Sequence, residues 1–385
     1  MNILAILVLW RIGLFAISAT VARYFKFTPQ FPYSDIYLLP SNLPQFIWGF
    51  ANFDGVHYLT IAKSGYMAQF TQAFFPLYPL LVRILGLIIK DQTFIVSGLL
   101  LSFACFVVAV YFFKRLLLLD YKHSVVFWSL VFLLAFPTGF YFATVYGESL
   151  FFLLTVLVFW FARKRKWWLA GIFGFFAALT RINGILLLPV ILIEWLVLER
   201  HVTSWATFKK SVKESLWSLL KNPAMYLVPL GLITYMVYLK YAFGDPLFFW
   251  HAQEVFGAQR SVAIVLPPQV VWRYFKIIAT VEAFSYPFWT AIWEIGAFAL
   301  GVVALLFGHR KHVRLSYLLF GWGMLLLPTL TGTFSSLPRY VLLIFPLFIA
   351  LALIKNMTTR LALLIVSIGL QLLFLSHYLR GLWVA

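Results

Sequence analysis

Residues 93–122 read TFIVSGLLLSFACFVVAVYFFKRLLLLDYK, and this stretch decides how the rest of the chain is interpreted. Its first part, 93–113, contains no charged side chain. About 20 apolar residues suffice for an α-helix to cross a bilayer, so this part predicts a transmembrane helix. Lys114, Arg115 and Lys122 follow it, and basic loops favour the cytoplasmic side of a membrane. The stretch therefore predicts both a crossing and its direction.

The composition of the whole chain agrees with a membrane environment. Of its 385 residues, 63% are apolar and 11% are charged, whereas an average soluble domain has about 25% charged residues. These values exclude a soluble enzyme, a disordered chain and a disulfide scaffold. The net charge of +18 is attributed to cytoplasmic loops, so no nucleic-acid partner is expected. Cys105 is the single cysteine, which leaves no intramolecular disulfide.

Apolar runs separated by charged residues, Pro or Gly predict an all-α fold: one integral membrane domain, 1–385, with about eleven transmembrane helices. The first run lacks a basic n-region and a cleavage site, so it is interpreted as a span and not as a signal peptide. The expected spans lie near 3–22, 93–113, 124–143, 149–162, 167–180, 184–198, 223–241, 286–307, 315–331, 340–354 and 361–379.

This topology places 17 of the 30 Lys and Arg residues on one side, which we assign to the cytoplasm. They are Lys114, Arg115 and Lys122; Arg163 to Lys166; Arg200, Lys209, Lys210, Lys213 and Lys221; Arg310, Lys311 and Arg314; and Lys355 and Arg360.

Two segments decide whether this count is consistent. A span at 74–90 would move the KRLLLLDYKH loop to the outside, so 74–90 is predicted to be an interfacial helix in the first extracytoplasmic loop, 23–92. A single helix over 167–194 would put the basic loop at 200–221 on the wrong face. The TRING sequence at 180–184 is therefore predicted to be an extracytoplasmic turn between two helices.

The loops on the outer side contain most of the unusual polar residues. A dispersed set of such residues on one membrane face predicts an active site built from loops between spans. In chain order the set comprises NFDGVHYLTIAKSGY (52–66), FFPLYP (74–79), YGES (146–149), Arg181 with Asn183, FGDPLFFWHAQ (243–253) and SLPRY (336–340).

Asp54 is the candidate general base. A carboxylate in a partly apolar pocket has a raised pKa and can take a proton from a hydroxyl in a transition state. The alternative is that Asp54 caps the helix expected over 55–64, since Asp is a preferred cap residue. His57 and Tyr58 follow one helical turn later, on the same face as Asp54. His57 is a candidate for positioning a hydroxyl or a phosphate, with a structural role as its alternative.

Three charged residues and one amide are further candidates for substrate binding. Glu148 starts a span, where it either binds substrate or complements the helix dipole as a solvated carboxylate. Arg181 and Asn183 bracket a break at membrane depth, where a charge is costly and indicates function. Arg339 follows a Pro at the start of a span. Each arginine offers a planar fork of donors that suits a phosphate, and the alternative is that each extends to the lipid headgroups.

Two other acidic residues stand out. Asp245 lies in a Gly-Asp-Pro sequence that first indicates a turn and is a weaker candidate for substrate binding. Glu294 lies in the middle of an expected span, and the sequence does not name its partner. No group of His and acidic residues has the spacing of metal ligands, so no metal site is expected.

The motifs together resemble the PIG-V family of mannosyltransferases and its prokaryotic relatives, within the GT-C class of membrane glycosyltransferases. The resemblance rests on NFDGVHYLTIAKSGY, FFPLYPLL, YGESLFFLLT, TRINGILLLP, FGDPLFFWHAQ and SLPRYVLLIFPLF, in this order along nearly the whole chain. It implies a polyprenyl-phosphate-sugar donor, such as a polyprenyl-phosphate mannose, and an active site on the non-cytoplasmic face. It also implies an acidic base in the first outer loop, and Asp54 is the matching position. The chain is shorter than the eukaryotic members, so a prokaryotic relative with a different acceptor is expected.

The function expected from the sequence is an inverting glycosyltransferase that moves a sugar, mannose by the resemblance, to a hydroxyl of a lipid-linked or glycan acceptor. No cofactor is required, because phosphate is a good leaving group that needs positioning, a base and charge stabilisation. The expected location is the plasma membrane of a prokaryote, or the endoplasmic reticulum membrane of a eukaryote. The alternative is a transporter or flippase of lipid-linked sugars, although no inverted repeat is found.

Overall fold

The structure is a computed structural model that describes residues 3–68, 70–199, 223–256 and 260–384. Within these ranges it consists of helices and connecting turns without β-strands, so the prediction of an all-α fold is confirmed. The basic residues expected at 200–221 lie outside the described residues.

The α-helices are α1 (Ile3–Tyr24), α2 (Ser34–Tyr37), α3 (Gln45–Trp48), α4 (Asp54–Ser64), α5 (Leu77–Ile89), α6 (Ile95–Leu117), α7 (His123–Leu134), α8 (Glu148–Arg163), α9 (Trp167–Ala178), α10 (Leu187–Glu199), α12 (Leu227–Phe243), α13 (Phe248–His251), α14 (Pro267–Thr280), α15 (Tyr286–Arg310), α16 (Leu315–Leu326), α17 (Leu337–Val341), α18 (Phe345–Ala352) and α19 (Met357–Leu379). The 3-10 helices are η1 (Leu39–Ser41), η2 (Gly49–Ala51), η3 (Thr71–Ala73), η4 (Gly139–Ala143), η5 (Ile182–Leu186), η6 (Pro223–Tyr226), η7 (Ala252–Phe256) and η8 (Pro328–Thr331).

Six helical segments among the described residues are long and apolar enough to cross a membrane. They are Ile3–Tyr24, Ile95–Leu117, Ile182–Glu199, Pro223–Phe243, Tyr286–Arg310 and Met357–Leu379. Each agrees with an expected span, so the chain is a multi-pass integral membrane protein. The other expected spans correspond to shorter helices, such as α7, α9 and α16, and the total of about eleven stays a prediction.

The short helices end where proline or a tight turn interrupts them. The span expected over 124–143 divides because α7 ends before Pro137 and the chain continues as η4. Pro346 lies in the first turn of α18, where the missing N–H costs nothing, and it separates α18 from α17. Both expected spans therefore contain broken helices.

The two segments that decided the topology are both helical. α5, over 77–89, has 13 residues, about 20 Å at 1.5 Å per residue, which is shorter than a bilayer core. The segment 167–199 is divided into α9 and α10, so the prediction of two helices is confirmed. The turn between them is tight, because a Cβ atom added to Gly184 would lie 2.4 Å from the backbone nitrogen of Ala178.

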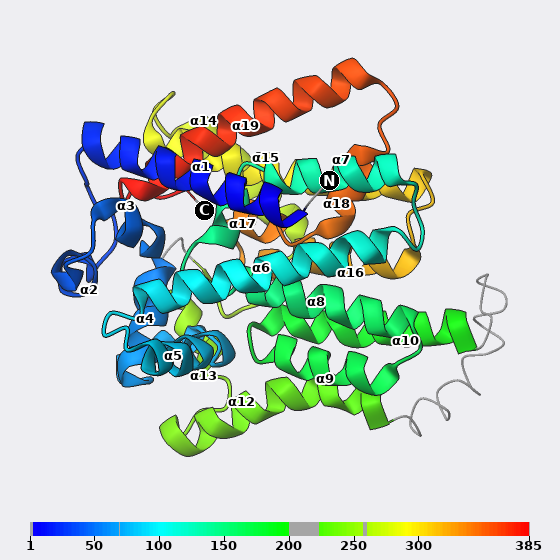
Figure 1. Ribbon diagram of the computed structural model, residues 1–385, viewed down its shortest axis with the longest axis horizontal. Coiled ribbons are helices and arrows are strands. Elements are labelled where there is room, and N and C mark those ends of the chain that lie inside the picture. The colour runs from blue at the N-terminus through cyan, green and yellow to red at the C-terminus, as the bar shows by residue number, and fades with distance from the viewer. Residues whose placement is uncertain (1–2, 69, 200–222, 257–259, 385) are drawn as a thin grey trace.

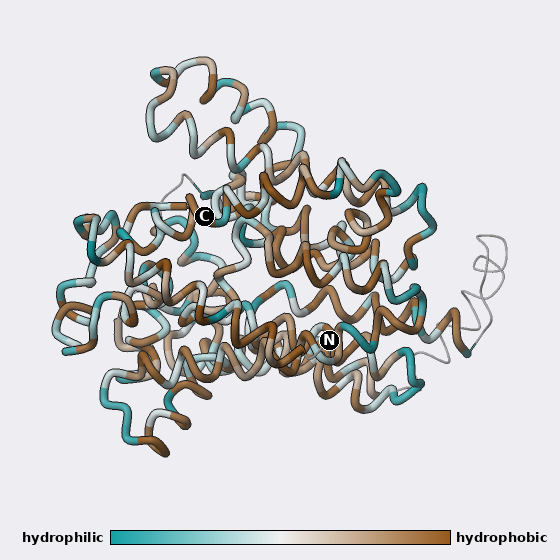
Figure 2. The backbone as a smooth tube through the Cα atoms, turned by 45° about the horizontal axis from the view of Figure 1, so that its top comes forward, coloured by the Kyte–Doolittle hydropathy of each residue, from teal (hydrophilic) through white to brown (hydrophobic). Residues whose placement is uncertain are grey.

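The long helices lie roughly alongside one another (Figure 1). The turns that join α6 to α7, α15 to α16 and α18 to α19 lie at one end of the bundle, at the right of the view. The short helices α2 to α5 and α13 gather at the opposite end. Hydrophobic residues dominate the long helices, and hydrophilic residues are frequent in the connecting segments (Figure 2). The bundle therefore has a basic end and an opposite end built from loops and short helices.

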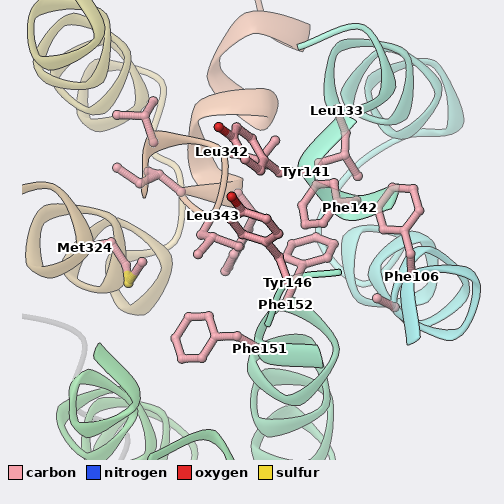
Figure 3. Close-up of a cluster of buried hydrophobic side chains, with 14 of the residues drawn as sticks. Phe106, Leu133, Tyr141, Phe142, Tyr146, Phe151, Phe152, Met324, Leu342 and Leu343 are labelled. Carbon is pink, nitrogen blue, oxygen red and sulfur yellow. The ribbon is translucent and has the colours of Figure 1, made fainter. Parts of the chain in front are cut away.

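Small residues and aromatic rings pack the bundle tightly. A Cβ atom on Gly231 of α12 would lie 2.2 Å from the carbonyl oxygen of Phe175 in α9, so glycine is needed for the two backbones to approach. Phe142 stacks on Phe106 with ring centroids 4.5 Å apart and contacts Phe152 at 5.2 Å (Figure 3). This buried layer supports Tyr141 and Tyr146, whose rings lie next to the guanidinium of Arg339.

Candidate active site

A cavity of about 170 Å³ is lined by residues of α4, α17, the turn after α9 and neighbouring loops. Its lining includes five of the eight residues that the sequence predicted as site residues: Asp54, Tyr58, Arg181, Asn183 and Arg339. They come from three separate parts of the chain, namely α4, the turn after α9 with the adjoining η5, and α17. The predicted convergence of the outer-loop motifs is therefore seen in the structure.

Asp54 is the first residue of α4 and not its cap. The cap position is Phe53, and no side chain caps this helix, so the capping alternative for Asp54 is not what the structure shows. Phe53 has φ 55°, a left-handed value that is costly for a bulky residue and is found where function constrains the backbone. The backbone N–H of Asp54 donates to the Tyr146 hydroxyl at 3.1 Å, and that hydroxyl donates to the Asn52 carbonyl at 2.9 Å. These hydrogen bonds stabilise the strained backbone at Phe53 and orient the Asp54 carboxylate.

The Asp54 carboxylate forms an ion pair with Arg339, 285 residues away in the sequence. Nη1 of Arg339 donates to Oδ2 of Asp54 at 2.5 Å, and the Arg339 side chain is 6% exposed. Its guanidinium lies 5.3 Å from the ring centre of Tyr146 and 5.7 Å from that of Tyr141. The aromatic faces stabilise the cation and fix its plane.

Glu148 connects this pair to Arg181. Nη2 of Arg181 donates to Oε1 of Glu148 at 2.9 Å, and Nε of Arg339 lies 3.4 Å from the same oxygen. The Glu148 side chain is fully buried, so the alternative of a solvated carboxylate is wrong. Glu148 lies behind the two arginines and does not line the cavity, so we assign it to positioning them and not to contacting substrate.

Four buried polar atoms around the cavity have no hydrogen-bond partner within the described part of the chain. They are Oε2 of Glu148, Nη1 of Arg181, Nδ2 of Asn183 and Nε of Arg339. An unsatisfied buried donor costs about 1–3 kcal/mol, and more when it is charged. Three of these atoms are donors that a bound phosphate or hydroxyl would satisfy.

The charges around Asp54 lower its pKa. Burial raises the pKa of the Asp54 carboxyl. Arg339, His57 and Arg260 together lower it by more than burial raises it, so the pKa lies below the ordinary value. The expectation of a raised pKa is therefore wrong, because the sequence did not show that a guanidinium contacts the carboxylate. At neutral pH Asp54 is ionised and able to accept a proton.

Besides Glu148, two other predicted site residues lie away from the cavity wall. His57 stacks on Phe74 with ring centroids 4.9 Å apart, and burial lowers its pKa although Asp54 raises it. Asp245 is partly exposed and forms the predicted turn: its carboxylate accepts from the backbone of Leu247 at 2.9 Å and contacts His251 Nδ1 at 2.6 Å. The turn presents its neighbours Phe249 and Trp250 to the cavity, whereas Asp245 does not line it, and its assignment to substrate binding stays a prediction.

Sequence reasoning missed Arg260 and Trp383, which also line the cavity. Arg260 donates to Oε1 of Gln253 at 2.9 Å and lies 3.4 Å from the hydroxyl of Ser336. A basic residue in a loop assigned to the outer face departs from the positive-inside pattern, and this signal could have identified Arg260. Trp383 follows the last expected span, and no comparable feature of the sequence indicated that it lines a site.

The chain is also similar to known proteins. A model of the family described as Mannosyltransferase (PIG-V) matches residues 3–257. The chain belongs to this family. The matched range contains Asp54, Glu148, Arg181 and Asn183, so the resemblance stated from the motifs is confirmed.

Individual relatives of this PIG-V family member match a smaller part of it. The chain is 31% identical over 147 residues to GPI alpha-1,6-mannosyltransferase 2 of Homo sapiens, which is 36% of this chain and 30% of that protein. The Mus musculus protein of the same name is 30% identical over 154 residues, 37% of this chain and 31% of that protein. The chain therefore spans about a third of the length of the curated relatives it matches.

Solved structures give a more distant match. The oligosaccharyltransferase of Archaeoglobus fulgidus tethered with an acceptor peptide is 13% identical, with a TM-score of 0.43, over 97% of this chain and 55% of that chain. Its apo form gives a TM-score of 0.44 over 97% of this chain and 56% of that chain.

Proposed function

We propose that this PIG-V family member is an inverting glycosyltransferase that moves a mannosyl group from a polyprenyl-phosphate donor to a hydroxyl of a lipid-linked or glycan acceptor. One observation carries the proposal: an ionised carboxylate, Asp54, is held at a cavity wall beside buried arginines with unused donors. The description of the family and the names of the mammalian relatives support mannose as the sugar.

The arrangement supports a single displacement. The acceptor oxygen forms a bond to the anomeric carbon while the bond from that carbon to the phosphate oxygen breaks. The electron pair leaves with the polyprenyl phosphate, and the proton of the acceptor hydroxyl goes to Asp54. Attack on the face opposite the leaving group inverts the anomeric centre.

The arginines stabilise the departing charge. Arg339 uses Nη1 for Asp54 and keeps its Nε free of a hydrogen bond, and Arg181 keeps Nη1 free. A phosphate placed between them receives charge-assisted hydrogen bonds without breaking the pair that aims Asp54. Tyr58 and Asn183 contribute a hydroxyl and an amide to the same cavity. This scheme keeps the expectation that no metal or other cofactor is required.

Transfer by purified protein tests the proposal. The protein in lipid nanodiscs is incubated with radiolabelled polyprenyl-phosphate mannose and an extract of acceptor lipids. We expect label to move to an acceptor without any membrane gradient, with inverted stereochemistry at the anomeric carbon. Movement of intact donor across a vesicle membrane, without transfer, would favour the flippase alternative instead.

The face of the membrane on which transfer occurs is tested separately. Ile182 lines the cavity, in the TRING turn. In a Cys105→Ala background, the Ile182→Cys variant is expected to react with a membrane-impermeant maleimide added from outside intact cells, while a Lys122→Cys control at the basic end reacts only after disruption. The reverse pattern would place the cavity on the cytoplasmic face.

A further inference from the structure

Two more cavities adjoin the candidate active site at Trp383. The first, about 550 Å³, shares Trp383 and Ser335 with the active-site cavity, and we call it the polar side pocket. The second, about 400 Å³, shares Tyr286, Thr290 and Trp383 with the polar side pocket, and we call it the apolar slot. The Trp383 ring also contacts Phe53, the residue before Asp54, with ring centroids 5.5 Å apart. Trp383 therefore lines all three cavities and lies next to the residue that precedes Asp54, the proposed base.

The polar side pocket contains an acidic residue where the active-site cavity contains arginines. Glu294 of α15 is 5% exposed and lies in a membrane-spanning helix, where a carboxylate indicates a functional site. The Tyr274 hydroxyl donates to Glu294, and Trp383 lines the same pocket. The partner of Glu294 that the sequence did not identify is therefore Tyr274.

The chemistry of this pocket suits hydroxyls better than phosphate. Besides Glu294 it presents the hydroxyl-bearing residues Thr290, Thr333 and Ser335, which donate and accept hydrogen bonds. Its one arginine, Arg273, donates to the Gly332 carbonyl at 2.9 Å. A phosphate would face the Glu294 carboxylate, whereas the active-site cavity offers it Arg181, Arg260 and Arg339.

The apolar slot continues from this pocket between two membrane-spanning helices, α15 and α19. Trp293 stacks near Trp289 with ring centroids 5.8 Å apart and contacts Phe374 at 5.3 Å. A molecule whose head group occupies the polar side pocket would therefore have an apolar channel for a hydrocarbon tail.

We propose that the polar side pocket and the apolar slot together bind the acceptor, a lipid whose head group is rich in hydroxyls and presents no phosphate to this pocket. The inference rests on the proposed function and names its second substrate. The donor phosphate occupies the arginine-lined cavity, the acceptor head group lies beyond Trp383, and the attacking hydroxyl reaches Asp54 past that ring.

Protection from labelling tests this assignment without catalysis. Thr290→Cys and Ile182→Cys are made separately in the Cys105→Ala background and held in nanodiscs that expose both faces. Octyl mannoside serves as the acceptor probe and undecaprenyl phosphate as the donor probe. At ten times its dissociation constant, octyl mannoside is expected to slow maleimide labelling about tenfold in the Thr290→Cys variant and to leave the Ile182→Cys variant unchanged.

The donor probe is expected to give the opposite pattern. Protection of the Thr290→Cys variant by undecaprenyl phosphate alone would assign the slot to the donor chain and overturn the inference, as would the absence of protection by either probe. If octyl mannoside protects the Thr290→Cys variant while undecaprenyl phosphate fails to protect the Ile182→Cys variant, the donor site of the proposed function is wrong and the hydroxyl-binding pocket stands.

Kinetics give a second test. Thr290→Leu removes a hydroxyl and fills space where the pocket meets the slot, so the KM for the acceptor is expected to rise about tenfold while the KM for the donor is unchanged. Thr280→Leu is the matched control, because Thr280 is exposed at the end of α14 and lines none of the three cavities. A rise in the KM for the donor with unchanged acceptor dependence would overturn the inference.

Discussion

Helix α8 has a cluster of acidic and basic residues at each end, and the two clusters differ in whether buried donors are left without a hydrogen-bond partner. Its first residue, Glu148, belongs to the cluster with Asp54, Arg181 and Arg339 at the cavity. Its last residue, Arg163, belongs to a cluster at the basic end, about 22 Å away at 1.5 Å per residue.

In the cluster at the basic end, the acidic and basic side chains are paired with one another. Arg163 makes two hydrogen bonds to Asp120, at 2.6 and 2.8 Å, and Tyr317 donates to the same carboxylate at 2.9 Å. Arg314 binds both oxygens of Glu194 at 2.6 Å. Among the described residues, no buried side-chain nitrogen or oxygen of these five lacks a partner, and none of them lines the cavities discussed above.

We therefore propose a functional role for the ion pairs at the cavity and a structural role for those at the basic end. Both clusters join helices that are far apart in sequence, and both bury carboxylates. Of the two clusters, only the one at the cavity has buried donors without a hydrogen-bond partner among the described residues, and we propose that a bound ligand satisfies them. Substitutions at the two ends should therefore have different consequences, on transfer at one end and on stability at the other.

The largest expected effect is on transfer. Asp54→Asn preserves the size of the side chain but cannot accept a proton, so transfer should fall by about 100- to 10,000-fold. The matched control at the basic end, Asp120→Asn, should retain transfer. Both are measured at saturating donor with correctly folded protein. Near wild-type turnover of the Asp54→Asn variant would show that Asp54 is not the base, and Glu148 would be the next candidate.

The next effect concerns use of the donor. Arg339→Ala should lower transfer by about 100- to 1,000-fold, as for other groups that stabilise a departing anion. Arg339→Lys retains the charge but loses the planar fork, so it should be impaired less. Donor titrations at fixed acceptor measure both, with Arg163→Lys as the control. Unchanged donor dependence in the Arg339→Lys and Arg339→Ala variants would leave Arg181 as the phosphate ligand.

At the basic end the expected effect is on stability. Glu194→Gln leaves Arg314 without its carboxylate, and breaking a buried pair costs about 3–5 kcal/mol in free energy of unfolding. Glu199→Gln is the control, because Glu199 lies 3.8 Å from an Arg165 side chain that is 56% exposed, and such a pair contributes less than about 1 kcal/mol. Thermal unfolding in detergent measures both. Equal melting temperatures would show that this cluster is not a structural clamp.

The smallest effect is a shift of the pH profile. Arg260 is one of the cations that lower the pKa of Asp54, so Arg260→Ala should raise that pKa. Since the ionised form accepts the proton, the acid limb of kcat/KM should move to higher pH, by less than about one unit. Arg165→Ala, at the basic end, should leave the profile in place. A shift to lower pH would contradict the assignment of this limb to Asp54.

The sequence by itself determined the membrane environment, the all-α class, the family and the division at the TRING turn. These features depend on local composition and on motifs within about 20 residues, because a bilayer selects helices by apolar length alone. The sequence also identified Asp54, Tyr58, Arg181, Asn183 and Arg339, since charges and amides are rare among apolar residues. It placed spans near 124–143 and 340–354 but not their breaks, which turn geometry at Pro137 and Pro346 decides.

Only the tertiary structure decided how these residues are paired. The contact between Asp54 and Arg339 joins positions 285 apart in the chain, and no local pattern encodes such a distance. That contact lowers the pKa that burial alone would raise, and the full burial of Glu148 turns a helix-end carboxylate into a bridge between two arginines. The position of Trp383 between three cavities likewise depends on how α15 and α19 pack. The sign of an electrostatic effect depends on distances between side chains, and those exist only once the helices are assembled.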